Sequence, residues 1–188
     1  YISAQENSHE CMALLLQHGA DANTAKNDGW APLHISAQEN SHECLTLLLL
    51  NGADAGRVNN DGSTPLHIAT YHNSHECMTL LLKQHGVVVD AIDEDGQTAL
   101  MWASEDGHQL IAEMLVQGRA NIDIADADGK TAIVIAREKG HTALARYLDA
   151  ESKWRRRGPL VMVLSSIYDA PTDSKMMRVF QCHDLARE

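Results

Sequence analysis

Aromatic side chains are scarce in this chain of 188 residues, making up 4% of it with a single phenylalanine. Hydrophobic residues still reach 44%, an ordinary value for a globular protein, which argues against wholesale disorder. The core must therefore be built from aliphatic side chains and methionine. Long apolar stretches are missing as well, which argues against a membrane-spanning helix, and no signal-peptide pattern opens the chain.

Cysteine and basic residues are also in short supply. The four cysteines are too few for a disulfide-rich secreted scaffold, so we expect reduced, buried thiols in a cytoplasmic or nuclear protein. The 15 basic residues face 26 acidic ones, and residues 1–150 hold 8 basic and 21 acidic side chains. Such an acidic body repels phosphate backbones, so we expect no nucleic-acid binding and instead a basic protein partner.

The chain repeats itself with a period of 33 residues. Residues 2–11 recur without change at 35–44, and the end of that segment recurs at 73–77. The dipeptide Asp-Gly, which favours a tight turn, keeps nearly the same spacing at 28–29, 61–62, 95–96 and 128–129. A fixed period of this length is the signature of a repeat array.

The repeated motifs give the array a specific resemblance. Thr-Pro-Leu-His-Ile-Ala stands intact at 64–69, and altered copies stand at 31–36, 98–103 and 131–136. Gly-His occurs at 107–108 and 140–141, and Leu-Leu followed by Gly-Ala-Asp occurs at 15–21 and 49–54. In these motifs the chain resembles ankyrin repeat proteins over about residues 1–150. The resemblance implies an all-α solenoid of stacked helix-turn-helix units with hairpin or turn fingers between them.

The array is expected to hold one truncated unit at 1–26 and four fuller units beginning near residues 27, 60, 94 and 127. Residues 151–188 match no ankyrin unit, and we expect a helical cap on the last unit or the start of a truncated further domain. In this tail, Gly158-Pro159 is predicted to end any helix before it, with a separate short helix at 160–167. Both ends of the chain look cut.

Local chemistry predicts where the first helix of each unit begins and ends. Thr64 is a typical N-cap, and Pro65 fits the first helical turn, where no N–H partner is needed. Asn7, Asn40 and Asn73 stand at the ends of first helices and are expected to adopt positive φ, as are Gly107 and Gly140 in the later units.

The second helix of each unit has its own boundary signals. Serine precedes it and is predicted to cap its N-terminus, at Ser8, Ser41 and Ser74. Glycine is predicted to close it, at Gly52, Gly86 and Gly118.

Two recurring polar patterns suggest chemistry but favour structure. Cys11, Cys44 and Cys77 lie on neighbouring helices about 8–10 Å apart, whereas one zinc ion needs every sulfur within about 2.3 Å. We therefore expect all three to be packing residues. The ankyrin resemblance implies that His34 and His67 bond the adjoining turn and tie one unit to the next. We accordingly expect no catalytic residue, no metal and no cofactor.

The resemblance implies that partners bind at the hairpin tips and on the first-helix face of a concave groove. The positions in this chain are Asn27, Asp28, Trp30, Gln38, Glu39, Asn60, Asp61, Ser63, Tyr71, His72, Glu94, Asp95, Gln97, Glu105, Asp106, Asp128 and Lys130. Trp30 and Tyr71 are the expected anchors, because exposed Trp and Tyr dominate many interfaces. The alternative for Trp30 is that it lies flat on its neighbouring hairpin.

These observations together predict a monomeric, non-catalytic module that binds a protein partner. Two alternatives remain open. In the first, the chain is a substrate-recruiting adaptor of a ubiquitin-ligase complex. In the second, it is the ankyrin portion of a larger catalytic or channel protein. A repeat scaffold leaves specificity to its surface side chains, so the partner itself is not predicted.

Overall fold

The computed structural model describes residues 8–168, the last twelve of them as backbone only. The chain divides into two compact units, residues 1–149 and residues 150–188. The described helices are α2 (His9–Gln17), α3 (Pro32–Gln38), α4 (His42–Leu50), α5 (Pro65–Tyr71), α6 (His75–Leu81), α7 (Ala99–Asp106), α8 (Gln109–Gln117), α9 (Ala132–Glu138) and α10 (Thr142–Tyr168).

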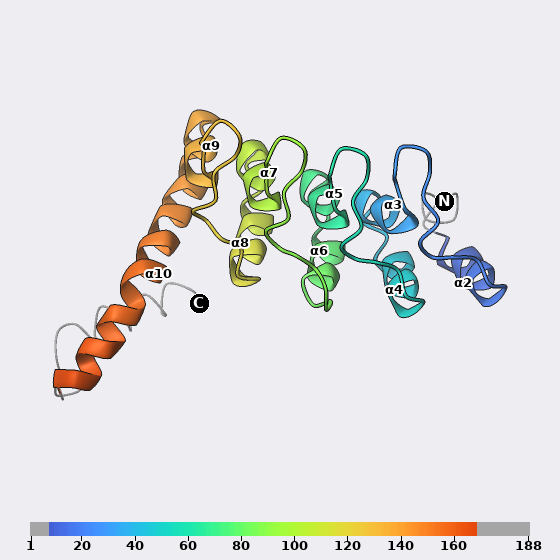
Figure 1. Cartoon of the computed structure of the whole chain (residues 1–188), viewed down its shortest axis with the longest axis horizontal. Coiled ribbons are helices and arrows are strands. Elements are labelled where there is room, and N and C mark those ends of the chain that lie inside the picture. Colours follow the sequence, from blue (N-terminus) through green and yellow to red (C-terminus); the bar gives the residue numbers. More distant parts are fainter. Residues whose placement is uncertain (1–7, 169–188) are drawn as a thin grey trace. The chain divides into compact units, whose positions relative to one another are not determined.

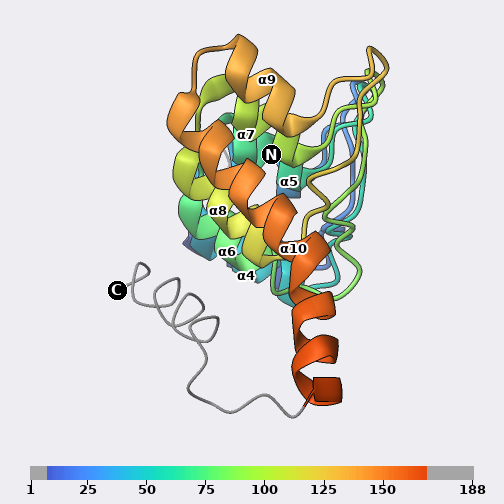
Figure 2. The ribbon, with the colours of Figure 1, turned by 90° about the vertical axis from the view of Figure 1, so that its left-hand side faces the viewer.

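Within residues 1–149 the helices form two layers (Figure 1). Helices α3, α5, α7 and α9 lie side by side in one layer, and α2, α4, α6 and α8 lie in the other. The turns between units project together to one side of the helices (Figure 2). Over residues 8–168 regular strands are absent, and two isolated β-bridges, Ile92–Thr98 and Ala125–Thr131, mark the turns. The prediction of an all-α solenoid is confirmed.

The core runs continuously between the two layers. First helices bury Leu33, Leu66 and Leu100, and second helices bury Leu45 and Met78, all at 1% exposure or less. No single unit encloses such a core, because each contributes one apolar face per helix. Stability is therefore a sum over neighbouring units.

The predicted boundaries of the first helices are confirmed where the structure describes them. Thr64 Oγ1 accepts the backbone N–H of His67 at 3.4 Å, and α5 begins at the next residue, Pro65. Asn40 and Asn73 adopt positive φ, at 51° and 54°. Gly107 and Gly140 do the same at 71° and 83°, whereas Asn7 lies outside the described residues.

The predicted serine caps are only half right. Ser8, Ser41 and Ser74 do precede α2, α4 and α6, but none of them makes a side-chain capping hydrogen bond. Their ψ angles lie near 80°, against 166° at the working cap Thr64, and this rotation turns the hydroxyl away from the first N–H groups. The Oγ of Ser74 is accordingly buried without a partner.

The predicted closing glycines are right at Gly52 and Gly118, which follow the C-cap of α4 and form the C-cap of α8, but wrong at Gly86, because α6 already ends at Leu81. Gly52 and Gly86 take positive φ, at 80° and 90°, but Gly118 has φ of −71°. Arg119 adopts the left-handed conformation instead, with φ of 69°. The reason is register, because residue 119 stands 33 positions after Gly86 and inherits its place in the repeat.

The tail departs from prediction as well. Helix α10 runs from Thr142 to Tyr168, straight through Gly158-Pro159, so the predicted break there is wrong. A proline removes one backbone hydrogen bond and crowds the preceding turn, which kinks a helix without obliging it to end. Residues 160–167, predicted as a separate helix, are part of α10. The predicted loop at 171–173 and helix at 174–188 lie outside the described residues.

Candidate functional site

The turn tips are stacked by backbone hydrogen bonds from one unit to the next. The N–H of Asn60 donates to the carbonyl oxygen of Asp28 at 3.0 Å, and that of Glu94 donates to Asp61 at 3.2 Å. Gly62 makes this approach possible, because it has φ of 73° and a Cβ added there would lie 2.9 Å from the nitrogen of Glu94. The tips therefore present their acidic side chains in a regular row.

Each turn is closed from within by one polar side chain. Asn59 Oδ1 accepts the N–H groups of Asp61 and Ser63 at 3.0 and 2.8 Å. Asp93 Oδ1 accepts those of Asp95 and Gln97 at 3.0 and 2.8 Å. Asn59 and Asp93 thus set the shape of the turns. The carboxylates of Asp61, Glu94 and Asp95 on the same turns are not needed for that purpose and can contact a partner.

Two buried histidines link consecutive units, as the resemblance implied. The Nε2 atoms of His34 and His67 lie 3.1 and 3.2 Å from the carbonyl oxygens of Ser63 and Gln97. Their Nδ1 atoms accept backbone N–H groups within their own units, so each ring is neutral with its proton on Nε2. Burial lowers the pKa of both rings. Met101 fills the same slot in the next unit, where its sulfur accepts the N–H of Thr98 at 3.4 Å.

The repeated cysteines differ from prediction at one position. Cys44 and Cys77 are buried, and burial raises the pKa of the Cys77 thiol to about 12. Cys77 Sγ donates to the carbonyl oxygen of Ser36 in the preceding unit. Cys11 is exposed, so its predicted packing role is wrong. The described residues include no unit before α2 that would cover it.

The predicted partner-binding positions are mostly accessible. Those that are exposed are Asn27, Asp28, Glu39, Asn60, Asp61, Tyr71, His72, Glu94, Asp95, Asp106 and Asp128. Those that are partly buried are Trp30, Gln38, Gln97, Glu105 and Lys130. Ser63 is the exception, at 2% exposure, because its backbone is bonded on both sides and leaves little surface for a partner.

Seven of these positions come together around one pocket of about 410 Å³. Its lining residues come from three consecutive units and are Trp30, Asn59, Asp61, Ser63, Ile68, Tyr71, His72, Asp93, Glu94, Asp95 and Trp102. The other ten predicted positions do not line it. Four lining residues were missed by the sequence analysis, namely Asn59, Ile68, Asp93 and Trp102.

Trp102 is the most informative of the missed residues. Its Nε1 donates to Asp93 Oδ2 at 2.9 Å, and its ring meets that of Tyr71 edge to face with centroids 6.0 Å apart. The equivalent positions in neighbouring units are Ile68 and Ile135, both buried. A tryptophan that replaces isoleucine in register was the available signal, because its larger ring extends beyond the space an isoleucine fills.

Comparison with known families agrees with this architecture. A family model described as "Ankyrin repeats (3 copies)" matches residues 1–57 and 37–126. The chain belongs to the ankyrin repeat family. A search of curated proteins found no match. Ankyrin repeats are generally protein–protein interaction modules and are typically non-catalytic.

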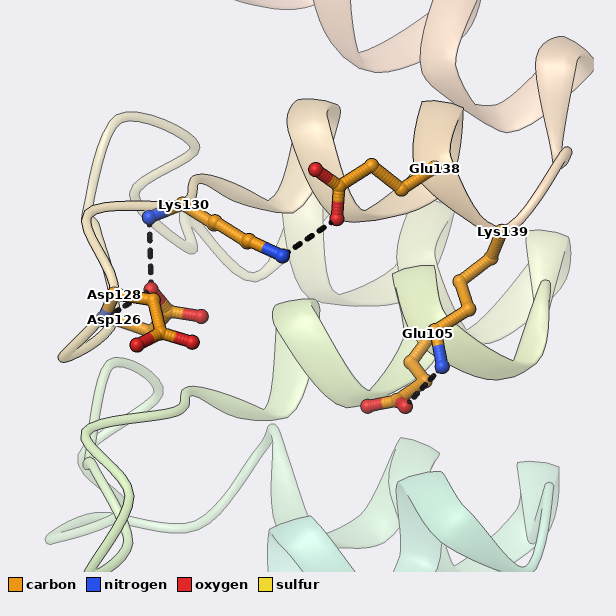
Figure 3. Close-up of polar contacts among 6 residues, drawn as sticks. All are labelled: Glu105, Asp126, Asp128, Lys130, Glu138 and Lys139. Atoms are coloured by element: carbon orange, nitrogen blue, oxygen red, sulfur yellow. Dashed lines mark hydrogen bonds and ion pairs between the residues drawn. The ribbon is translucent and has the colours of Figure 1, made fainter.

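The last ankyrin unit, beginning near residue 127, lies beyond the matched residues and differs in charge. Lys130 Nζ lies 2.7 Å from Glu138 Oε2, and Lys139 Nζ lies 2.6 Å from Glu105 Oε1 (Figure 3). The hydrogen bond to Glu138 is the main cause that raises the pKa of Lys130. These exposed pairs contribute little stability, but each neutralises one lysine and one glutamate on this part of the ankyrin surface.

Two kinds of site are not seen in the part of the ankyrin chain that the structure describes. Among residues 8–168, His, Cys, Asp and Glu side chains form no group able to hold a metal ion. None of the described helices is both long and apolar enough to cross a bilayer.

Proposed function

We propose that this ankyrin array is a monomeric, non-catalytic module that binds a basic protein segment across its turn tips and first helices. The observation that carries the proposal is the composition of the pocket. Its lining combines four carboxylates with two tryptophans, one tyrosine and one histidine, and contains no lysine or arginine. A concave surface of one charge attracts a partner of the other.

The carboxylates and the rings have separate roles in this proposal. Asp61, Glu94 and Asp95 are exposed on the turns, where they attract a basic segment and speed its encounter. Such charges are screened over about 8 Å at physiological ionic strength, so the association is salt-sensitive. Tyr71, exposed at 58%, anchors the bound segment.

The test uses two variants with the same change in net charge. Glu94→Gln with Asp95→Asn removes two charges at the pocket, and Glu10→Gln with Glu43→Gln removes two exposed charges from second helices. Binding of two fluorescent 12-residue peptides, one basic and one acidic, is followed by anisotropy and stopped flow at two salt concentrations. We expect preference for the basic peptide, with association slowed about tenfold by the pocket variant only.

A third variant examines the anchor. Tyr71→Ala should weaken binding of the basic peptide by more than about 2 kcal/mol, mainly through faster dissociation. Equal binding of basic and acidic peptides would refute the proposal. A partner that binds the pocket variants as tightly as the parent, but no longer binds when residues 154–188 are removed, would place the function in the tail instead.

A further inference from the structure

The pocket places aromatic rings next to carboxylates that form no ion pair with a lysine or arginine among the described residues. Trp102 has one polar atom, Nε1, and this atom already donates to Asp93. What the indole presents to the pocket is therefore its ring and not a hydrogen-bond donor. Tyr71 adds a second ring, edge to face at 6.0 Å, and Trp30 adds a third from the preceding turn.

The carboxylates of the pocket differ in how far they are already used. Asp93 accepts two backbone N–H groups through Oδ1 and the indole of Trp102 through Oδ2. It therefore serves the fold. Glu94 and Asp95 follow it on the same turn, are exposed, and are among the residues that line the pocket. Acceptors thus come from the turns, whereas the rings of Tyr71 and Trp102 come from α5 and α7.

The lysines of the last unit do not satisfy these acceptors. Lys130 and Lys139 are held by Glu138 and Glu105, at 2.7 and 2.6 Å (Figure 3). Glu105 lies three residues after the pocket residue Trp102 on the same face of α7, and its ion pair with Lys139 engages both of these charges. The ion pairs among the described residues include neither Glu94 nor Asp95.

We infer that this pocket receives a single arginine side chain of a partner protein. An arginine guanidinium is planar, so it stacks on an aromatic face while its edge donates to carboxylates in pairs. A lysine ammonium is a compact, strongly hydrated charge that gains less from the rings. The volume of about 410 Å³ admits a long side chain together with the backbone that carries it.

The inference rests on the proposed function, because it specifies what the same surface recognises. The probes are 12-residue peptides of Gly, Ser and Ala that carry four lysines and one central position X. X is arginine, lysine, trimethyllysine or citrulline, the last of which keeps the shape of arginine but is uncharged. We expect the arginine peptide to bind about tenfold more tightly than the citrulline peptide and about fivefold more tightly than the lysine peptide.

Two variants take their new residue from the chain's own repeats, so that the fold is retained. Trp102→Ile installs the residue found at Ile68, and Tyr71→Gln installs the one found at Gln38. Both should bind all four peptides within about threefold of one another. Trp154→Ala removes an exposed tryptophan outside the array and should leave the arginine preference intact. Thermal melts by circular dichroism check that each variant is folded.

The outcomes separate the two proposals. If lysine or citrulline peptides bind as well as the arginine peptide, the arginine inference is wrong, while a preference for basic over acidic peptides keeps the proposed function. Tighter binding of trimethyllysine than of arginine also overturns the inference, since a trimethylated ammonium cannot donate to the carboxylates. If basic peptides have no advantage over acidic ones, both proposals fail.

Discussion

The buried histidines make the stability of the array depend on pH in a defined direction. Burial lowers the folded-state pKa of His34 and His67 below the ordinary value of 6.5. The unfolded chain therefore binds these protons more readily than the folded one. The contribution of each neutral ring to the free energy of unfolding is fully present above pH 6.5. It is lost progressively as the pH falls from 6.5 to the folded-state pKa.

The size of the effect follows from the ordinary pKa. A shift of one pH unit is worth about 1.4 kcal/mol for each group. At pH 5, which is 1.5 units below 6.5, each histidine held neutral costs at most about 2 kcal/mol, and the pair at most about 4 kcal/mol. Between pH 7 and pH 6 the loss is smaller than this, so no sharp unfolding is expected there.

The perturbation is His67→Met, which copies the residue that the next unit carries at Met101. The variant should be less stable at pH 7.5 by about 0.5–1.5 kcal/mol, because the carbonyl oxygen of Gln97 loses the donor His67 and keeps only the N–H of Asp93. Between pH 7.5 and pH 5 its free energy of unfolding should fall by up to about 2 kcal/mol less than that of the parent.

Urea unfolding followed by circular dichroism at several pH values measures both effects. His85→Gln, in the exposed loop after α6, is the matched control and should follow the parent. A parent and a His67→Met variant that lose equal stability between pH 7.5 and pH 5 would refute the assignment of the buried rings as neutral links.

Two further experiments, with three substitutions between them, test the backbone. Arg119→Gly should stabilise the array by about 1 kcal/mol in urea unfolding, because Arg119 is held at φ of 69°, where a Cβ is strained. A loss of stability would show that the arginine side chain outweighs that strain. Gly62→Ala should destabilise by at least about 2 kcal/mol more than Gly129→Ala, measured in the same way. Both glycines have positive φ, but a Cβ at Gly62 meets the backbone nitrogen of Glu94 at 2.9 Å, whereas one at Gly129 meets nothing within 4 Å. Equal losses would mean that the stacked tips yield easily.

The repeat architecture could be predicted from the sequence because its signals are local. Asp-Gly favours a turn, a Thr cap such as Thr64 favours a helix start, and a residue that tolerates positive φ, such as Asn40 or Asn73, favours a helix end. Each choice depends on a few neighbouring residues and recurs every 33 positions. The period therefore determined the units and, with the family resemblance, the histidine links between them.

Local signals were weaker where the backbone setting mattered more than residue type. Serine is a good capping residue, yet Ser41 and Ser74 do not cap, because the short turn between the two helices holds ψ near 80°. Pro159 lies inside α10, although a helix often ends before a proline. In each case a preference of about 1–3 kcal/mol was outweighed by the surrounding chain.

The tertiary structure alone decided the pocket and its charge. Trp30, Tyr71 and Trp102 belong to three different units, and only stacking brings their rings around one cavity. Lys139 Nζ and Glu105 Oε1 belong to residues 34 positions apart in sequence but lie 2.6 Å apart in space. The charge of Glu105, a predicted contact residue, is therefore paired within the chain. The sequence by itself determined the units, since turns and caps are local. Which side chains face one another depends on the stacking of those units, and so does the candidate site.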